Sequence, residues 1–193
     1  MKFQKSMKVN KNQFLYDRWW RDIVFSLKQK NILGFLVNRM EWYFYPRFSL
    51  VKNKFPLHVD IETSNVCQMK CPMCYTISEK FTKNTNRRFI DWDLFVKIVD
   101  ECAEANIFSI RLSWRGEPLM HPRILDMVKY AKEKGIRNVS LITNGLLLEE
   151  KITSKLIEYG LDYLNISMDG VGEKYDRIRK PSKYIEAIER VKN

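Results

Sequence analysis

From Pro56 to the end of the chain, the sequence alternates between short strand patterns and longer helix patterns. Strand patterns are expected at 57–63, 108–114, 139–143 and 161–168, and helix patterns at 92–105, 122–134, 148–159 and 182–192. Gly135 and Gly160 stand where helix C-terminal caps belong. Strands and helices of these lengths in this order predict parallel βαβ units with right-handed crossovers, and hence an α/β doubly wound sheet or barrel.

Three of the predicted strands, 57–63, 108–114 and 161–168, have one polar face. A parallel sheet covered on both sides is apolar on both, and a closed eight-stranded barrel is filled with branched apolar side chains. The inner face here instead carries Asp60, Glu62, Arg111, Asn165 and Ser167. The pattern therefore predicts a partial parallel βα barrel with a wet interior. The alternative is ion pairing of Arg111 with the acids of the first strand, which would compensate charges that are costly to bury alone.

Three of the four cysteines follow the first predicted strand at a C-x3-C-x2-C spacing: Cys67, Cys71 and Cys74. Three thiolates on one short loop can each bind an iron of a [4Fe-4S] cluster, leaving one iron without a protein ligand. Catalytic zinc sites keep one position open in the same way. Structural zinc and a disulfide are the alternatives. Zinc would need a fourth ligand, and Cys102 lies instead on the apolar face of a predicted helix, in step with Trp92, Phe95, Ile98 and Val99.

Three further motifs end predicted strands: Gly116-Glu117-Pro118-Leu119, Thr143-Asn144-Gly145 and Ser167-Met168-Asp169-Gly170. In parallel βα architectures, chemistry lies at the carboxyl ends of the strands, so these motifs and the cysteine loop are expected to meet there. Glu117 suits the role of an acceptor for a cation. Its alternatives are a helix N-terminal acid and a solvated loop carboxylate. Thr143, Asn144 and Ser167 can also be ordinary turn-forming residues.

The four motifs in this order resemble the radical S-adenosylmethionine (radical SAM) family, whose signature is this cysteine spacing, usually with an aromatic residue just before the third cysteine. Met73 holds that position here, and its soft apolar side chain still suits an adenine ring. Tyr75 supplies an aromatic ring just after Cys74. The resemblance implies a [4Fe-4S] cluster with S-adenosylmethionine as cofactors.

The resemblance also implies roles for the other motifs. The segment Gly116, Glu117 and Pro118 would accept hydrogen bonds from the cofactor ammonium, while Thr143, Asn144 and Ser167 would bond its ribose or carboxylate, with Asp169 beside them. Arg179 either reaches the cofactor carboxylate or is a solvated helix charge. His58 is either a substrate contact or a strand histidine satisfied by a neighbour, and His121 precedes a helix start.

By this resemblance the protein is a radical SAM enzyme. It would reductively cleave S-adenosylmethionine to a 5′-deoxyadenosyl radical that abstracts hydrogen from an unknown substrate, such as a peptide or saccharide component. The electron would come from a flavodoxin- or ferredoxin-like donor. The resemblance covers residues 56–193 and ends after four of the family's usual six βα units, which predicts a truncated chain or an incomplete barrel with an unpaired edge. The alternative is a non-catalytic iron-sulfur or partner-binding fragment.

Residues 1–55 differ from the remainder in charge. They hold 12 Lys/Arg and 3 Asp/Glu, a net charge of +9, whereas the other residues hold 22 and 20, a net charge of +2. Two amphipathic helices are expected, one over residues 16–27 and one carrying Leu33, Leu36, Val37, Met40 and Phe44, ending before Pro46. This basic aromatic extension is interpreted foremost as a helical cap on the barrel, then as an anchor on an anionic membrane surface, and last as a nucleic-acid site.

The sequence carries no uncharged segment typical of a signal peptide, and its longest apolar run, residues 32–37, is too short to span a bilayer. These features predict a cytoplasmic protein, with peripheral membrane attachment as the variant in which residues 1–55 act as an anchor. A reducing cytosol suits thiolate ligation of iron.

Overall fold

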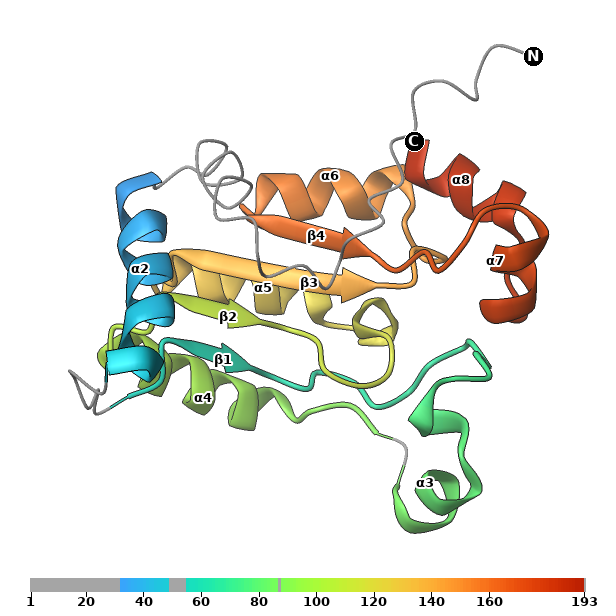
Figure 1. Cartoon of the computed structure of the whole chain (residues 1–193). Coiled ribbons are helices and arrows are strands. Elements are labelled where there is room, and N and C mark those ends of the chain that lie inside the picture. The colour runs from blue at the N-terminus through green and yellow to red at the C-terminus, as the bar shows by residue number, and fades with distance from the viewer. Residues whose placement is uncertain (1–31, 49–54, 87, 193) are drawn as a thin grey trace.

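The computed structural model describes residues 32–48, 55–86 and 88–192. Figure 1 shows a parallel sheet with helices around it. Its elements in chain order are α2 (Ile32–Phe48), β1 (His58–Asp60), the 3₁₀ turn η1 (Tyr75–Ile77), α3 (Glu79–Asn84), α4 (Trp92–Glu104), β2 (Ser109–Arg111), the 3₁₀ turn η2 (Pro118–Met120), α5 (Ile124–Glu133), β3 (Asn138–Thr143), α6 (Glu150–Glu158), β4 (Tyr163–Ile166), α7 (Glu173–Ile178) and α8 (Tyr184–Lys192).

The four strands pair in the order β1-β2-β3-β4, and every pair is parallel. His58 lies opposite Ser109, which lies opposite Asn138, and Ser140 lies opposite Tyr163. All four carboxyl ends therefore point to the same edge of the sheet (Figure 1). The predicted βαβ order and the partial barrel are confirmed. The strands β1 and β2 are shorter than predicted, because the chain leaves the ladder early to form the loops that carry the motifs.

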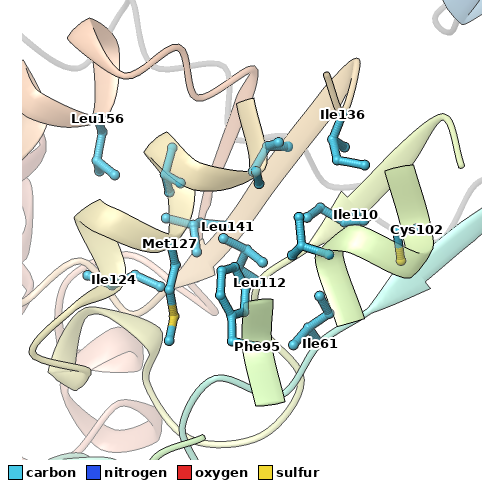
Figure 2. Close-up of a cluster of buried hydrophobic side chains, with 14 of the residues drawn as sticks. Ile61, Phe95, Cys102, Ile110, Leu112, Ile124, Met127, Ile136, Leu141 and Leu156 are labelled. Carbon is cyan, nitrogen blue, oxygen red and sulfur yellow. The ribbon is translucent and has the colours of Figure 1, made fainter. Parts of the chain in front are cut away.

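The hydrophobic core lies between the sheet and the helices α4, α5 and α6. Figure 2 shows side chains from these helices meeting those of the strands. Phe95 and Val99 of α4 are fully buried, as are Ile110 of β2 and Leu141 of β3. Burying a side chain of this kind contributes about 1.5–3 kcal/mol, so this layer fixes the sheet. Cys102 belongs to the same cluster, which confirms its predicted place on the apolar face of a helix.

The helix boundaries follow local signals in the sequence. Asp91 precedes α4, and its carboxylate accepts hydrogen bonds from the amides of Asp93 and Leu94. Gly135 and Gly160 follow α5 and α6 with φ of 86° and 81°, the left-handed conformation that glycine adopts without steric cost. Both predicted C-terminal caps are confirmed. The short helices α3 and α7 were not predicted, because six residues are too few to establish a helical period.

The inner face of β1 and β2 carries two ion pairs. Arg111 Nη2 lies 2.6 Å from Asp60 Oδ2, and Arg115 binds Glu62 through Nε at 2.5 Å and Nη2 at 3.0 Å. The alternative interpretation, in which Arg111 pairs with the acids of the first strand, holds for Asp60, whereas Glu62 pairs with Arg115 instead. Both pairs are half exposed, so this face contacts solvent as predicted for a wet interior.

His58 lies beside the first of these pairs. Its Nδ1 is 2.7 Å from Ser109 Oγ, and its Nε2 is 2.9 Å from Asp60 Oδ1. The structure therefore confirms that His58 is a strand histidine satisfied by its neighbours.

Helix α2 crosses the amino ends of the strands (Figure 1). Phe35 packs edge-on against Phe108, and Trp42 packs against His58. Two expectations for this helix are wrong. It continues past Pro46 to Phe48, because a proline in the last turn removes only one helical hydrogen bond.

The predicted apolar stripe of α2 is also not its buried face. Four of the five residues of the stripe are exposed: Leu33, Val37, Met40 and Phe44. Phe35 and Asn38 of α2 are buried instead. The first expected helix, over residues 16–27, lies outside the described residues. Within the described ranges, no helix has both the length and the apolar character needed to cross a membrane.

Candidate functional site

The loop after β2 docks against the segment that leads into the cysteine loop. The amide of Glu117 donates to the carbonyl of Val66 at 2.7 Å. Gly116 has a φ of 65°, and a Cβ at this position would overlap the carbonyl of Ser64 and lie 2.7 Å from the carbonyl of Val66. Only glycine permits this approach of two main chains. The motif residue Gly116 is thus required by the contact between the loops after β1 and β2.

The carboxylate of Glu117 joins the loop after β2 to the end of β3. Oε1 accepts hydrogen bonds from Thr143 Oγ1 at 2.7 Å and from the amide of Leu119 at 3.1 Å, and Oε2 accepts one from the amide of Asn144 at 2.7 Å. The side chain is 2% exposed. Burial raises the pKa of Glu117, and the three donors with the charge of Arg179 oppose that rise.

This arrangement bears on the predicted role of Glu117. The carboxylate is buried and links the loops after β2 and β3. It also caps the N-terminus of η2, as expected from the alternative in which Glu117 is a helix N-terminal acid. It is not a solvated loop carboxylate. Acceptance of a cofactor ammonium by the segment of Gly116, Glu117 and Pro118 stays a prediction.

Cys71 and Cys74 enclose a tight turn, and Cys67 lies just before it. The amide of Cys74 donates to the carbonyl of Cys71 at 2.9 Å, and the amide of Met69 donates to Cys67 Sγ at 3.4 Å. Thr76 Oγ1 lies 2.9 Å from Cys74 Sγ. All three are free cysteines, and so is Cys102.

Two other segments of the chain supply donors to two of these sulfurs. Asn144 Nδ2, after β3, is 3.8 Å from Cys67 Sγ, and Arg179 Nη1, after α7, is 4.0 Å from Cys71 Sγ. Burial raises the pKa of both Cys67 and Cys71, while the Arg179 guanidinium opposes the rise at Cys71. Polar donors directed at sulfur favour the thiolate, the form that binds metal.

The donor set fits an iron-sulfur cluster. Three cysteine sulfurs lie on one loop, each with a hydrogen-bond donor nearby, and iron-sulfur clusters are held by thiolates whose sulfurs accept such bonds. In the described part of the chain, no three His, Cys, Asp or Glu side chains are close enough together to hold a single metal ion. A cluster of four irons is larger than one ion and takes its thiolate ligands at wider separation.

The remaining predicted cofactor residues lie around the same edge. Asn144 Oδ1 accepts from the amide of Leu146, so this residue forms a local turn in addition to contacting Cys67. The amide of Ser167 donates to the carbonyl of Thr143 at 2.8 Å, which joins the ends of β3 and β4. Pro118 is buried at the start of η2. The side chains of Met73 and Tyr75 are exposed, and Tyr75 packs edge-on against Phe81. Their contact with an adenine ring stays a prediction.

The structure contradicts one of the two expectations for Arg179. Its side chain is 15% exposed, and its Nε lies 2.5 Å from Asp169 Oδ2. The reading of a solvated helix charge is therefore wrong, because a carboxylate and a sulfur enclose the guanidinium. Reaching a cofactor carboxylate stays a prediction. His121 precedes α5 as expected; its Nδ1 accepts from the amide of Arg123, and its Nε2 lies 3.2 Å from the carbonyl of Ile90.

Two residues of this edge were missed in the sequence. The amide groups of Gln68 and Asn144 contact each other at 3.3 and 3.4 Å, so Gln68 ties the cysteine loop to the end of β3. Its position between two motif cysteines was the available signal. Arg115, beside Gly116, lies four residues after Arg111 and so falls on the same side of an extended chain. This spacing was the signal for its pairing with Glu62. Trp114, the last residue of the strand expected at 108–114, lies beyond the end of β2 and is 66% exposed.

A cavity of about 690 Å³ opens beside the loop after β1. Its wall is about equally polar and apolar, and it includes the Glu62–Arg115 pair together with Asn65, Arg88, Phe89 and Asp91. Cavities of this volume are typical of sites for small ligands.

Comparison with known proteins gives a consistent result. Residues 61–193 match the family model of the Radical SAM superfamily. The chain is 34% identical over 110 residues to the tungsten-containing aldehyde ferredoxin oxidoreductase cofactor-modifying protein of Pyrococcus furiosus, covering 56% of this chain and 30% of that protein. It is 32% identical over 134 residues to a GTP 3',8-cyclase of Clostridium perfringens, covering 67% of this chain and 40% of that protein. It thus spans between about 30 and 40% of the length of these curated relatives.

Solved structures share the fold. The SuiB protein of Streptococcus suis bound to its precursor peptide SuiA superposes with a TM-score of 0.61 at 18% sequence identity, covering 84% of this chain and 35% of that chain. SuiB bound to S-adenosylmethionine superposes with a TM-score of 0.60, covering 85% of this chain and 37% of that chain.

Proposed function

The chain belongs to the radical SAM superfamily, and from that membership we propose that residues 56–193 form the cofactor-binding part of a radical SAM enzyme. Members of the superfamily are enzymes that use a [4Fe-4S] cluster and S-adenosylmethionine as cofactors. When bound, these cofactors supply the one-electron cleavage that yields a 5′-deoxyadenosyl radical for hydrogen abstraction from substrate.

One observation carries the proposal: the carboxyl ends of the strands are braced together around the cysteine loop. The loop after β2 reaches the cysteine loop through Glu117 and Val66, and the loop after β3 reaches it through Asn144 and Cys67. Such bracing holds ligand-bearing loops in a fixed geometry before a cofactor binds, which lowers the cost of ordering them.

The residues have distinct proposed roles. Cys67, Cys71 and Cys74 hold three irons of the cluster. Because the Glu117 carboxylate already accepts three internal hydrogen bonds, we propose the main-chain carbonyl of Gly116 as the acceptor for the cofactor ammonium. Asn144, Ser167 and Asp169 are proposed to contact the remainder of the cofactor, with Met73 and Tyr75 covering the adenine. An external flavodoxin- or ferredoxin-like protein would supply the electron.

The substrate is proposed to be a polar molecule, namely a peptide or a saccharide component. Two features support this class. The inner face of β1 and β2 presents half-exposed ion pairs, and the cavity beside it has charged side chains in its wall, among them Arg88 and Arg115. SuiB, which shares the fold, is described with a precursor peptide bound. Transfer of deuterium from labelled candidate peptides or saccharides into 5′-deoxyadenosine would distinguish the two classes by mass spectrometry.

Anaerobic reconstitution tests the proposed cluster. The full chain, supplied with iron and sulfide, should bind about four irons and four sulfides. Cys67→Ala, Cys71→Ala and Cys74→Ala should each lose most of this iron, whereas Cys102→Ala should retain it and serves as the matched control. If Cys102→Ala abolished cluster binding while a motif cysteine were dispensable, the ligand assignment would be wrong.

Cofactor cleavage separates the enzyme from the non-catalytic alternative. The loaded chain, given dithionite and S-adenosylmethionine, should release 5′-deoxyadenosine and methionine, measured by chromatography. A chain that binds the cluster but releases no 5′-deoxyadenosine under these conditions would instead be an iron-sulfur or partner-binding fragment.

A further inference from the structure

The segment after α7 is docked onto the cysteine loop. Lys180 follows Arg179, and its carbonyl accepts a hydrogen bond at 2.7 Å from the amide of Lys70, the residue before Cys71. The amide of Arg179 donates to the carbonyl of Tyr175 at 2.7 Å. Tyr175 is fully buried, and its hydroxyl lies 3.1 Å from Ser182 Oγ. Arg179 therefore projects from a braced turn that is itself bonded to the loop bearing the cysteines.

The guanidinium of Arg179 is held between two groups. Nη1 lies 4.0 Å from Cys71 Sγ, and Nε lies 2.5 Å from Asp169 Oδ2. The guanidinium is a rigid plane, so contacts at both Nε and Nη1 leave the side chain little freedom to turn away from Cys71. Cys71 is 4% exposed and the arginine side chain is largely buried, so solvent screens this contact only weakly.

A fixed cation beside a sulfur ligand has a definite effect on an iron-sulfur cluster. Reduction potentials of such clusters depend on net charge, on hydrogen bonds to the sulfurs and on solvent exposure. Reduction adds one negative charge. A nearby positive charge stabilises the reduced form more than the oxidised form and raises the potential. The negative charges of Asp169 and Glu117, which both interact with Arg179, act in the opposite direction.

We propose that Arg179 is a positioning residue that holds its positive charge against Cys71 and thereby raises the reduction potential of the cluster. The inference rests on the proposed function, because it requires a cluster bound by Cys67, Cys71 and Cys74. One electron enters from an external one-electron donor, and no bond to Arg179 forms or breaks. The residue makes reduction easier for a donor of a given potential.

The test compares three substitutions in the full chain. Arg179→Gln removes the charge, Arg179→Lys keeps it on a different head group, and Arg177→Gln removes an exposed charge two residues away as the matched control. Each variant is reconstituted anaerobically, and the reduced cluster is followed by electron paramagnetic resonance in a redox titration without substrate.

The expected result is a more negative midpoint potential for Arg179→Gln. The ratio of reduced to oxidised cluster at a fixed solution potential should fall about tenfold, which corresponds to about 59 mV for a one-electron couple. Arg179→Lys should shift less, and Arg177→Gln should match the unmodified protein. A glutamine variant that is folded but loses the cluster, beside a lysine variant that keeps it, would also support the role of the charge.

Other outcomes overturn the inference. They are an Arg179→Gln cluster with the potential of the unmodified protein, an equal shift in Arg177→Gln, or loss of the cluster in both position-179 variants, which would mean that shape and not charge matters. These outcomes differ from failure of the proposed function, in which the unmodified chain itself would bind no cluster.

Discussion

The two ends of the parallel sheet differ in which side chains are buried. At the carboxyl ends, Glu117 and Thr143 are almost fully buried although one carries a carboxylate and the other a hydroxyl. At the amino ends, α2 leaves Leu33 and Val37 exposed although both are apolar. Polarity alone therefore does not decide burial in this molecule.

Hydrogen bonding explains the difference. A buried polar group is tolerated when it has partners and is costly when it does not. Glu117 has three donors, and Thr143 both donates to Glu117 and accepts from the amide of Gly145 at 3.0 Å. The exposed side chains of α2 cost little, since apolar atoms form much of any protein surface. The carboxyl ends are consequently the sensitive half of the molecule, and the amino ends are the tolerant half.

The largest expected effect is that of Gly116→Ala. The added methyl group would overlap the carbonyl of Ser64, and the residue would also be strained at its positive φ. Strain and overpacking together predict a loss of about 3–5 kcal/mol in the free energy of unfolding. Urea denaturation followed by circular dichroism measures it. Gly135→Ala is the control, because that glycine also has a positive φ but meets nothing within 4 Å; an equal loss there would show that main-chain docking is not the cause.

A smaller loss is expected for Glu117→Gln. The amide NH₂ of glutamine cannot accept, so whichever way it is oriented it faces the buried amide hydrogen of Leu119 or that of Asn144. An unsatisfied buried donor costs about 1–3 kcal/mol. Denaturation at neutral pH provides the measurement, with the exposed Glu173→Gln as control. A variant as stable as the parent protein would show that the Glu117 carboxylate does not hold the loops together.

The pH dependence of stability offers a third test of the buried end. Burial lowers the pKa of His121 below its ordinary value of 6.5. The unfolded chain then binds more protons than the folded one between the lowered pKa and 6.5, so stability should rise with pH across that window. Protonation would also turn Nδ1 from an acceptor into a donor facing the amide of Arg123.

The denaturation midpoint of His121→Gln should vary less with pH across this window than that of the unmodified chain. If the two chains followed the same pH profile, His121 would not be the group responsible. The effect should be smaller than that at Glu117, because the imidazole loses its proton across this window and the contact with the Arg123 amide is then restored.

The smallest effect belongs to the amino ends. Leu33→Ser and Val37→Ser alter exposed side chains of α2, and each should change the free energy of unfolding by less than about 0.5 kcal/mol. Phe35→Ser on the same helix is the sharper contrast, because Phe35 is buried against Phe108 and should cost several times more. Equal losses at all three positions would mean that the exposed stripe packs against something in the folded protein.

Much of the fold could be predicted from the sequence. Alternating strand and helix patterns determined the parallel order, Gly135 and Gly160 determined two helix ends, and the period of α4 placed Cys102 in the core. The four motifs could be assigned to one edge because every strand of a parallel sheet ends there. These inferences succeed because periodicity and caps depend on residues close together in the sequence.

Only the tertiary structure decided which side chains meet. In the folded chain Glu62 pairs with Arg115, and the Glu117 carboxylate accepts hydrogen bonds from Thr143 and Asn144. Arg179 lies between Cys71 and Asp169. The tertiary structure also turned α2 so that Phe35 faces the sheet and its most regular apolar stripe does not. The physical reason is that a partner is chosen by distance in space: loops after different strands compete for the same donors, and the pattern of residues along one segment carries no record of that competition.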